Sequence, residues 1–70
     1  MTNVEMGIFV GKLLRWHEEG AFIIASVNED NDYFEIQIID VNGVKTYQEF
    51  NLYQGRKVWG MYHEELSSNN

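Results

Sequence analysis

Cysteine and proline are both absent from this 70-residue sequence. Without cysteine the chain can form neither a disulfide nor a thiolate metal site, which fits a reducing compartment. Without proline the strongest breaker of secondary structure is missing, so glycine and clusters of Asn and Asp must mark the turns. No apolar run is long enough to span a bilayer, and residues 1–5 lack the basic start of a secretory signal. We therefore expect a cytoplasmic protein, located in the host cytoplasm if a phage encodes it.

Basic residues are also scarce. Five Lys and Arg stand against 11 Asp and Glu, which gives a formal net charge of −6 at pH 7. Proteins that bind duplex DNA usually present a basic face that releases counterions from the phosphates, and anionic membrane surfaces attract basic segments. The composition therefore argues against both partners. It favours a partner with a basic surface, although a charge of this size also serves solubility alone.

The sequence contains enough apolar residues to form a hydrophobic core. Hydrophobic residues make up 44% of the chain and aromatic residues 14%, so the sequence is not of the disordered type. A chain of this length buries only about 60% of its unfolded surface, and a small core with free sheet edges is compatible with self-association as a homo-oligomer. We predict one small β domain over residues 1–66 and a disordered tail over residues 67–70.

The centre of the chain has the pattern of a β-hairpin. Asn42-Gly43 separates two β-type segments, residues 36–41 and 44–53, and this dipeptide is typical of a type I′ turn. Apolar residues alternate with polar ones from Phe34 to Ile38, which indicates a half-buried strand, and the phase then slips, which indicates a bulge or a strong twist near residues 38–40.

Two more segments resemble strands. Residues 21–27 form a short run rich in β-branched side chains, and the polar cluster 28–32 that follows reads as a loop. A turn at Gln54-Gly55 would lead to a last strand over residues 57–63.

The N-terminal segment has two interpretations. As a strand, residues 8–16 would pair with residues 21–27. As a helix, the apolar residues fall at helical spacing, Thr2 and Glu5 would form a capping box, and Gly20 would end the helix. Gly7 and Gly11 in the interior of that helix would each cost roughly 1 kcal/mol relative to alanine, which favours the strand.

These patterns predict a mainly β fold. We expect a small four- to five-stranded antiparallel meander, barrel-like and of SH3 or OB size. The alternative is an N-terminal helix over about residues 3–19, packed on a three- to four-stranded antiparallel sheet.

Part of the sequence resembles the opening of cold-shock domains. The similar stretches are residues 11–16, then Glu18-Glu19-Gly20 and Phe22-Ile23-Ile24, with residues 52–58 resembling a later stretch of that family. The resemblance covers about half of the chain and implies an OB-type barrel that stacks single-stranded bases on aromatic side chains. The chain departs from the family in having one aromatic residue in residues 21–25, no histidine-bearing third strand and little sequence after Glu65. Membership is therefore not assigned.

No motif indicates catalysis or a metal site. His17 and His63 each precede two glutamates, but their spacing matches no established metal pattern. The cluster Glu29, Asp30 and Asp32 lacks the order of a calcium-binding loop. Ser26 has no acid–base partner near it in the sequence. We therefore predict that the protein is not an enzyme and needs no cofactor or metal.

Aromatic residues are the best candidates for a binding surface, because Trp and Tyr dominate the energetics of protein interfaces. Carboxylates near them would steer a basic partner toward the surface. The aromatic candidates are Trp16, Tyr33, Tyr53, Trp59 and Tyr62. The acidic candidates are Glu18, Glu19, Glu29, Asp30 and Asp32.

The leading functional hypothesis is a non-enzymatic acidic module that inhibits or modulates a partner protein. Short, acidic chains without cysteine or a catalytic motif are common among the antagonists that phages and mobile elements encode, and such a chain could occupy a basic surface. The first alternative is an OB-type binder of single-stranded nucleic acid that stacks bases on Trp16, Phe22 and Tyr33. The second alternative is an oligomer that sequesters a small ligand between subunits.

Overall fold

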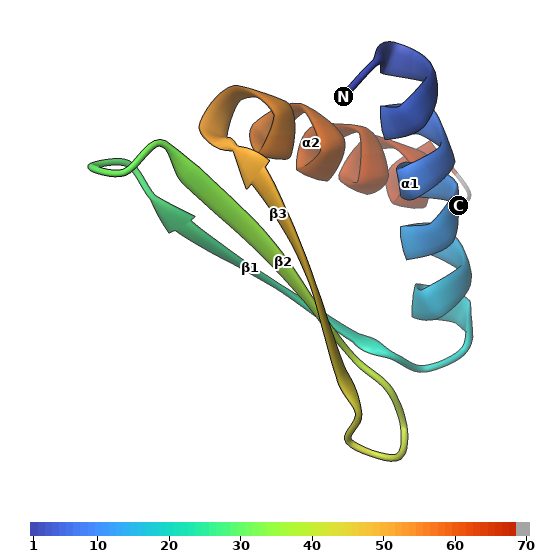
Figure 1. Ribbon diagram of the computed structural model, residues 1–70. Helices are drawn as coiled ribbons and strands as arrows, with labels where there is room; N and C mark the ends of the chain where they lie inside the picture. The colour runs from blue at the N-terminus through green and yellow to red at the C-terminus, as the bar shows by residue number, and fades with distance from the viewer. Residues whose placement is uncertain (69–70) are drawn as a thin grey trace.

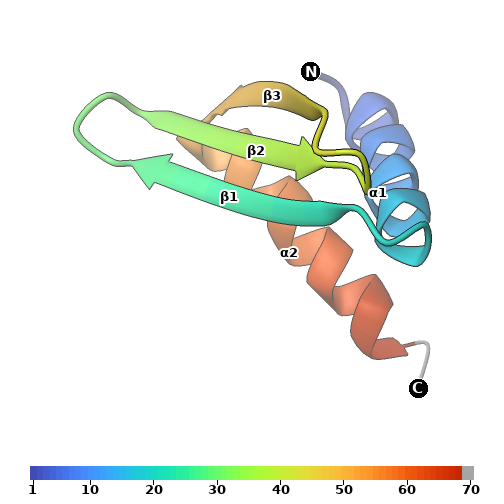
Figure 2. The same cartoon turned by 90° about the horizontal axis from the view of Figure 1, so that it is seen from below.

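Two helices and three antiparallel strands make up the described part of the chain. The computed structural model in Figure 1 describes residues 1–68. The elements are α1 (Asn3–Glu18), β1 (Phe22–Asn28), β2 (Tyr33–Ile39), β3 (Lys45–Asn51) and α2 (Leu52–Ser68). The strands form an open sheet in the order β1-β2-β3, and both helices cover one of its faces (Figures 1 and 2).

The predicted four- to five-stranded barrel is therefore wrong. The alternative of an N-terminal helix packed on a three- to four-stranded antiparallel sheet fits better, although it did not include the second helix, α2. The segments predicted as first and last strands are both helical. The three remaining strands are too few to close on themselves, so their apolar face is buried by the helices instead.

Helix α1 forms despite its internal glycines. The capping box is present, since the Thr2 side chain accepts from the Glu5 amide and the Glu5 side chain accepts from the Thr2 amide. Gly20 follows the helix with a φ of 83°, as the sequence indicated for its end. The buried residues of α1 are Met6, Phe9, Val10 and Leu13. Burial of each such side chain stabilises the fold by about 1.5–3 kcal/mol, which exceeds the cost of the two glycines.

Helix α2 replaces both the end of the strand predicted over residues 44–53 and the last strand predicted over residues 57–63. Strand β3 ends at Asn51, whose side-chain oxygen accepts a 2.8 Å hydrogen bond from the Gln54 amide and so starts the helix at once. The inward positions of α2 are Gly55, Val58 and Tyr62. Because the first of these is a glycine, the spacing of apolar residues along residues 52–68 shows only a weak helical period. The prediction of a strand over residues 57–63 is therefore wrong.

The central hairpin is confirmed, although its turn differs from the prediction. Pairing runs without interruption to Ile39↔Lys45, so the expected bulge is not present. Residues 40–44 form a longer loop in which the Asp40 carboxylate accepts from the amides of Asn42 and Val44 at 2.8 and 2.9 Å. A type I′ turn needs positive φ at both central residues, and here only Gly43 has it, at 82°.

The core lies between β2 and the helices. Its buried members are Met6, Phe9, Val10, Leu13, Phe34, Ile36, Ile38, Phe50, Val58 and Tyr62. The opposite face of the sheet is uncovered and carries exposed apolar side chains such as Phe22, Ile24 and Tyr47. Ser67 and Ser68, which the sequence assigned to the tail, are the last residues of α2, and residues 69–70 of that predicted tail lie outside the described part of the chain. Neither helix described here has the length and hydropathy needed to cross a membrane.

Candidate partner-binding groove

A groove runs between β1 and α2. The helix crosses the covered face of the sheet obliquely and continues past the free edge of β1 (Figure 2). Two hollows of about 920 and 450 Å³ lie between these elements, and both have Trp59 in their lining. We call the two hollows together the β1–α2 groove.

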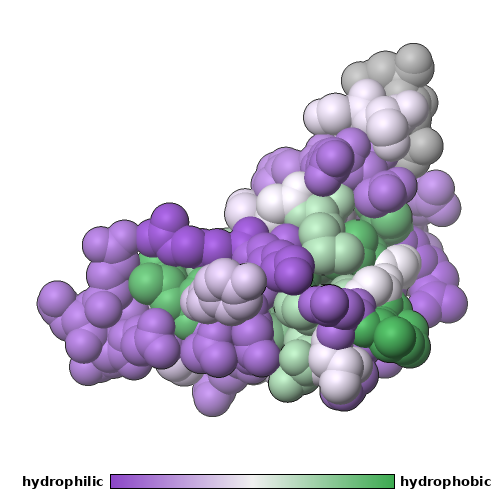
Figure 3. Space-filling view, turned by 90° about the horizontal axis from the view of Figure 1, so that it is seen from above, coloured by the Kyte–Doolittle hydropathy of each residue, from purple (hydrophilic) through white to green (hydrophobic). Residues whose placement is uncertain are grey.

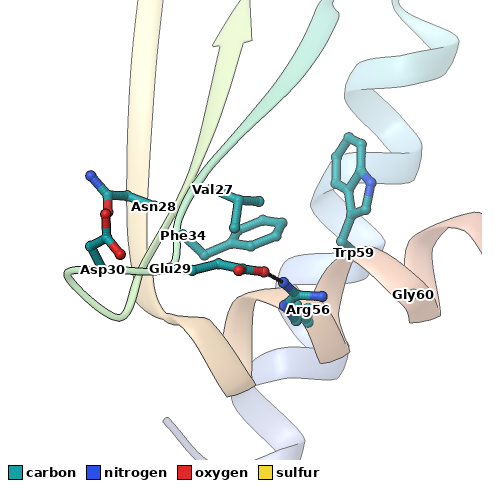
Figure 4. Close-up of a pocket in the computed structure, with 8 residues that line it drawn as sticks. All are labelled: Val27, Asn28, Glu29, Asp30, Phe34, Arg56, Trp59 and Gly60. Carbon is teal, nitrogen blue, oxygen red and sulfur yellow. Dashed lines mark hydrogen bonds and ion pairs between the residues drawn. The ribbon is translucent and has the colours of Figure 1, made fainter.

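The lining of the two hollows combines residues from distant parts of the sequence. The larger hollow is lined by Val27, Asn28, Glu29, Asp30, Phe34, Arg56, Trp59 and Gly60 (Figure 4). The smaller hollow is lined by His17, Gly20, Ala21, Phe22, Ile23, Trp59, Tyr62, His63 and Leu66.

The floor of the larger hollow is apolar and aromatic. Val27 and Phe34 are paired across β1 and β2 on the covered face of the sheet, and Trp59 faces them from α2 (Figure 4). The ring centroids of Phe34 and Trp59 are 6.4 Å apart. Phe34 is fully packed, whereas Trp59 is only partly buried. Trp59 therefore offers aromatic surface that a ligand could cover.

The rim of the larger hollow is charged. Glu29 Oε1 and Arg56 Nη2 form an ion pair at 2.6 Å between two exposed side chains. An exposed pair of this kind contributes at most about 1 kcal/mol, because water and salt screen it. Asp30 also lines the hollow, on the Asn28 side of the loop and apart from the ion pair (Figure 4), so the rim holds two carboxylates and one guanidinium. The rim is acidic and suits a basic ligand.

The loop that carries these carboxylates is tied to α2. The Asn28 side chain accepts a 3.1 Å hydrogen bond from the Asn31 amide, which tightens the turn after β1. Asp32 has a φ of 51°, and its carbonyl oxygen accepts a 3.2 Å hydrogen bond from the Leu52 amide at the start of α2. The loop is thereby placed next to Arg56.

The smaller hollow is walled by aromatic and imidazole rings. The Tyr62 hydroxyl and His17 Nδ1 are 3.1 Å apart, although 45 residues separate them in the sequence. His63 packs edge-on against Trp59, with ring centroids 4.8 Å apart. Burial raises the pKa of Tyr62, so its hydroxyl stays protonated. Within residues 1–68 no group of three or more His, Cys, Asp or Glu side chains is arranged to hold a metal.

Three of the residues predicted for partner binding meet in the groove, namely Trp59, Glu29 and Asp30. Tyr62 also contacts the groove, but its side chain is only 4% exposed and belongs mainly to the core. Tyr53 lies on the first turn of α2, is 74% exposed and is not part of the lining.

The remaining predicted residues lie elsewhere. Trp16 packs against Phe9 and, with Glu19, lines a separate hollow under the β2–β3 hairpin. Glu18 is the last residue of α1. Asp32 is in the β1–β2 loop, and Tyr33 is on the uncovered face of the sheet.

Several residues of the groove were missed by the sequence analysis, among them Phe34, Arg56 and His63. Arg56, Trp59 and His63 are spaced by three and four residues, which places them on one side of a helix. This signal was in the sequence, but it has meaning only once residues 52–68 are known to be helical.

The uncovered face of the sheet holds a second polar cluster. The Tyr33 hydroxyl donates to Glu35 Oε2 at 2.6 Å, and Gln37 donates to Glu35 Oε1 at 2.9 Å. Glu49 is the register partner of Glu35 on β3. The hydrogen bond to Glu35 raises the pKa of Tyr33, and the Glu49 carboxylate acts in the same direction, because both disfavour a phenolate.

The titration of Tyr33 can be tested by absorbance. Because its folded pKa is raised, its contribution to stability is present below the ordinary tyrosine pKa of about 10 and is lost as pH rises through the folded value. We expect Tyr33→Phe to remove one strongly alkaline step from the tyrosinate absorbance curve, and Glu35→Gln to move that step to lower pH. A curve whose alkaline end is unchanged in both variants would contradict the assignment.

No family model, curated protein or solved structure matches this chain. The functional argument therefore depends on the geometry of its own residues.

Proposed function

We propose that this chain is a non-enzymatic binding module that inhibits or modulates a partner protein by occupying a basic surface. The observation that carries the proposal is the β1–α2 groove, where the partly exposed ring of Trp59 stands over an apolar floor and beside the carboxylates Glu29 and Asp30. The inhibitory role itself is suggested by the small, acidic character of the chain.

The composition of the groove supports binding of a protein. Interfaces combine an apolar, aromatic centre with a polar rim, and tryptophan is among the residues that lose the most affinity when truncated. The net charge of −6 would speed the approach of a basic partner. Both hollows are open to solvent, so they suit contact with a surface better than a reaction that must exclude water.

The alternative of single-strand nucleic-acid binding loses its structural support. It required an OB-type barrel, whereas the sheet is open and three-stranded. Its stacking residues also do not form one platform. Trp16 packs beside Phe9 of α1, while Phe22 and Tyr33 lie at opposite ends of the uncovered face of the sheet. The small-ligand alternative places its site between subunits, whereas the two hollows of the groove are formed within one chain.

The proposal predicts that partner binding depends on Trp59. Tagged protein would be used to capture partners from lysate after nuclease treatment, and the retained partner would then be measured against purified variants. We expect Trp59→Ala to weaken binding by about 30-fold or more, because truncation of such an anchor costs about 2 kcal/mol or more. Tyr53→Ala, which removes an exposed aromatic ring outside the groove, should change the affinity less than about twofold.

Two further measurements complete this test. Trp59→Leu removes the aromatic ring but keeps apolar contact with the core, so this variant should remain folded. Weaker binding by folded Trp59→Leu would show that the loss of affinity comes from the missing ring and not from unfolding. Binding to a basic surface should weaken as salt is added. Full affinity in a folded Trp59 variant would remove the groove from the function, and a partner that disappears with nuclease would point to nucleic acid.

A further inference from the structure

Strand β1 is an edge strand with no protection against pairing. One side of it pairs with β2, and within residues 1–68 no other strand lies on its free side. Natural edge strands are usually guarded by charged residues, proline or a bulge. The residues of β1, Phe-Ile-Ile-Ala-Ser-Val-Asn, include none of these guards, and their register with β2 is unbroken. The other edge strand, β3, carries Lys45 and Glu49. The difference marks the edge of β1 as a pairing site.

Helix α2 continues past the free edge of β1 on the covered side of the sheet. Figure 2 shows α2 passing behind β1 and continuing past it, and in Figure 3 the C-terminal part of α2 projects from the body and leaves an angle beside the sheet. The two hollows lie at the two ends of β1, one lined by Phe22 and Ile23 and the other by Val27 and Asn28. A further strand placed beside β1 would therefore rest its inner side chains on α2, near Trp59 and Leu66.

A second copy of the chain suits this position less well than a single strand. Antiparallel pairing of β1 with its own copy places a two-fold axis perpendicular to the sheet, so the helices of both copies lie on the same face. In each copy α2 continues past the free edge of β1 (Figure 2), so a second copy would bring another helix into the space that α2 already borders. The edge instead suits a single extended segment that brings no helical layer of its own.

We propose that the β1–α2 groove accepts an extended segment of the partner protein as a fourth strand, antiparallel to β1. This inference deepens the proposed function and rests on it. Main-chain hydrogen bonds to β1 would supply affinity, and alternate apolar side chains would pack on Trp59. Antiparallel pairing brings the N-terminal end of the segment to Asn28. A Lys or Arg there would meet the carboxylates of Glu29 and Asp30.

The test uses heptapeptides selected by the full chain from a random phage-displayed library. We expect the selected peptides to alternate apolar and polar residues and to carry a basic residue near the N-terminus. Amide hydrogen exchange of the protein is then measured with and without a synthetic selected peptide. The β1 amides that point away from β2 should gain protection on binding, whereas the β3 edge amides should not. Failure to select any peptide that gives this pattern would overturn the proposal.

A pair of neighbouring substitutions separates strand addition from general charge effects. Ala25 lies on the covered face of β1 and Ser26 on the uncovered face. We expect Ala25→Lys to weaken peptide binding at least about tenfold, because its side chain enters the layer between the sheet and α2 where the inner side chains of the added strand would pack, and Ser26→Lys to change it less than about threefold. Equal effects of the two variants would contradict the proposed position.

Changes in the peptide test the pairing without any substitution in the protein, so the measured affinities do not depend on whether a protein variant folds. Methylation of a peptide nitrogen removes one donor, and we expect about a tenfold loss at the alternate residues whose amides face β1 and little loss at the others. Equal tolerance at all positions would exclude strand pairing. If peptide binding is lost in Trp59→Leu but the β1 amides gain no protection, the added strand is wrong and the groove remains the binding site. If peptide binding is unchanged in Trp59→Leu, the groove is not the binding site.

Discussion

Replacement of Leu13 by alanine is expected to lower the free energy of unfolding by about 2–5 kcal/mol. Leu13 is 0% exposed and belongs to the core between α1, the sheet and α2. A domain of this length has a total stability of only about 4–10 kcal/mol, so the variant should lose a large fraction of its stability and unfold at a clearly lower denaturant concentration. Chemical denaturation followed by far-UV circular dichroism would measure the change.

Ile8 supplies the matched control for Leu13. It lies in the same helix and is 58% exposed, so Ile8→Ala should change the stability by less than about 0.5 kcal/mol. The helix buries Phe9 and Val10 in succession, which a strand with one buried face cannot do. Similar losses for Leu13→Ala and Ile8→Ala would contradict the position of α1 in the fold.

Gly55→Ala is expected to destabilise the protein by about 1–3 kcal/mol, although alanine normally strengthens a helix. A methyl group on Gly55 would overlap the Phe34 side chain, because α2 packs directly on β2 at this point. Relief of the overlap requires movement of the helix or of a core ring. The equilibrium stability of the single variant, measured by denaturant unfolding, tests this close approach.

Two comparisons distinguish overlap from a general effect of the substitution. Gly11→Ala, where open space surrounds the added methyl group, should instead raise the stability by about 0.4–1 kcal/mol. Phe34→Leu should reduce the penalty of Gly55→Ala, since the two sites are in contact and their effects should not add. Stabilisation by Gly55→Ala would show that α2 does not sit this close to β2.

The close packing at Gly55 also bears on the groove. It places the next turn of α2, with Arg56 and Trp59, against the end of β1 and the β1–β2 loop. A shift of α2 to accommodate a methyl group would therefore change the width of the groove. Gly55→Ala should lower partner affinity as well as stability, in contrast to Gly11→Ala.

Parts of the fold could be predicted from local sequence. The alternation from Phe34 to Ile38 indicated β2, and Asn42-Gly43 correctly placed the hairpin. Thr2, Glu5 and Gly20 correctly marked the ends of a helix, although the strand was preferred. These signals were usable because each depends on residues that are neighbours along one strand or one helical turn.

The sequence by itself determined the acidic charge, the absence of cysteine chemistry, the central hairpin and the number of aromatic residues. Only the tertiary structure decided that residues 3–18 and 52–68 are helices, because burial against the sheet outweighs the preferences of Gly7, Gly11 and Gly55. It also decided which aromatic ring became available. Tyr62 is buried in the core, whereas Trp59 is partly exposed beside β1. The exposure of each ring depends on elements far away in the sequence and not on the residues beside it.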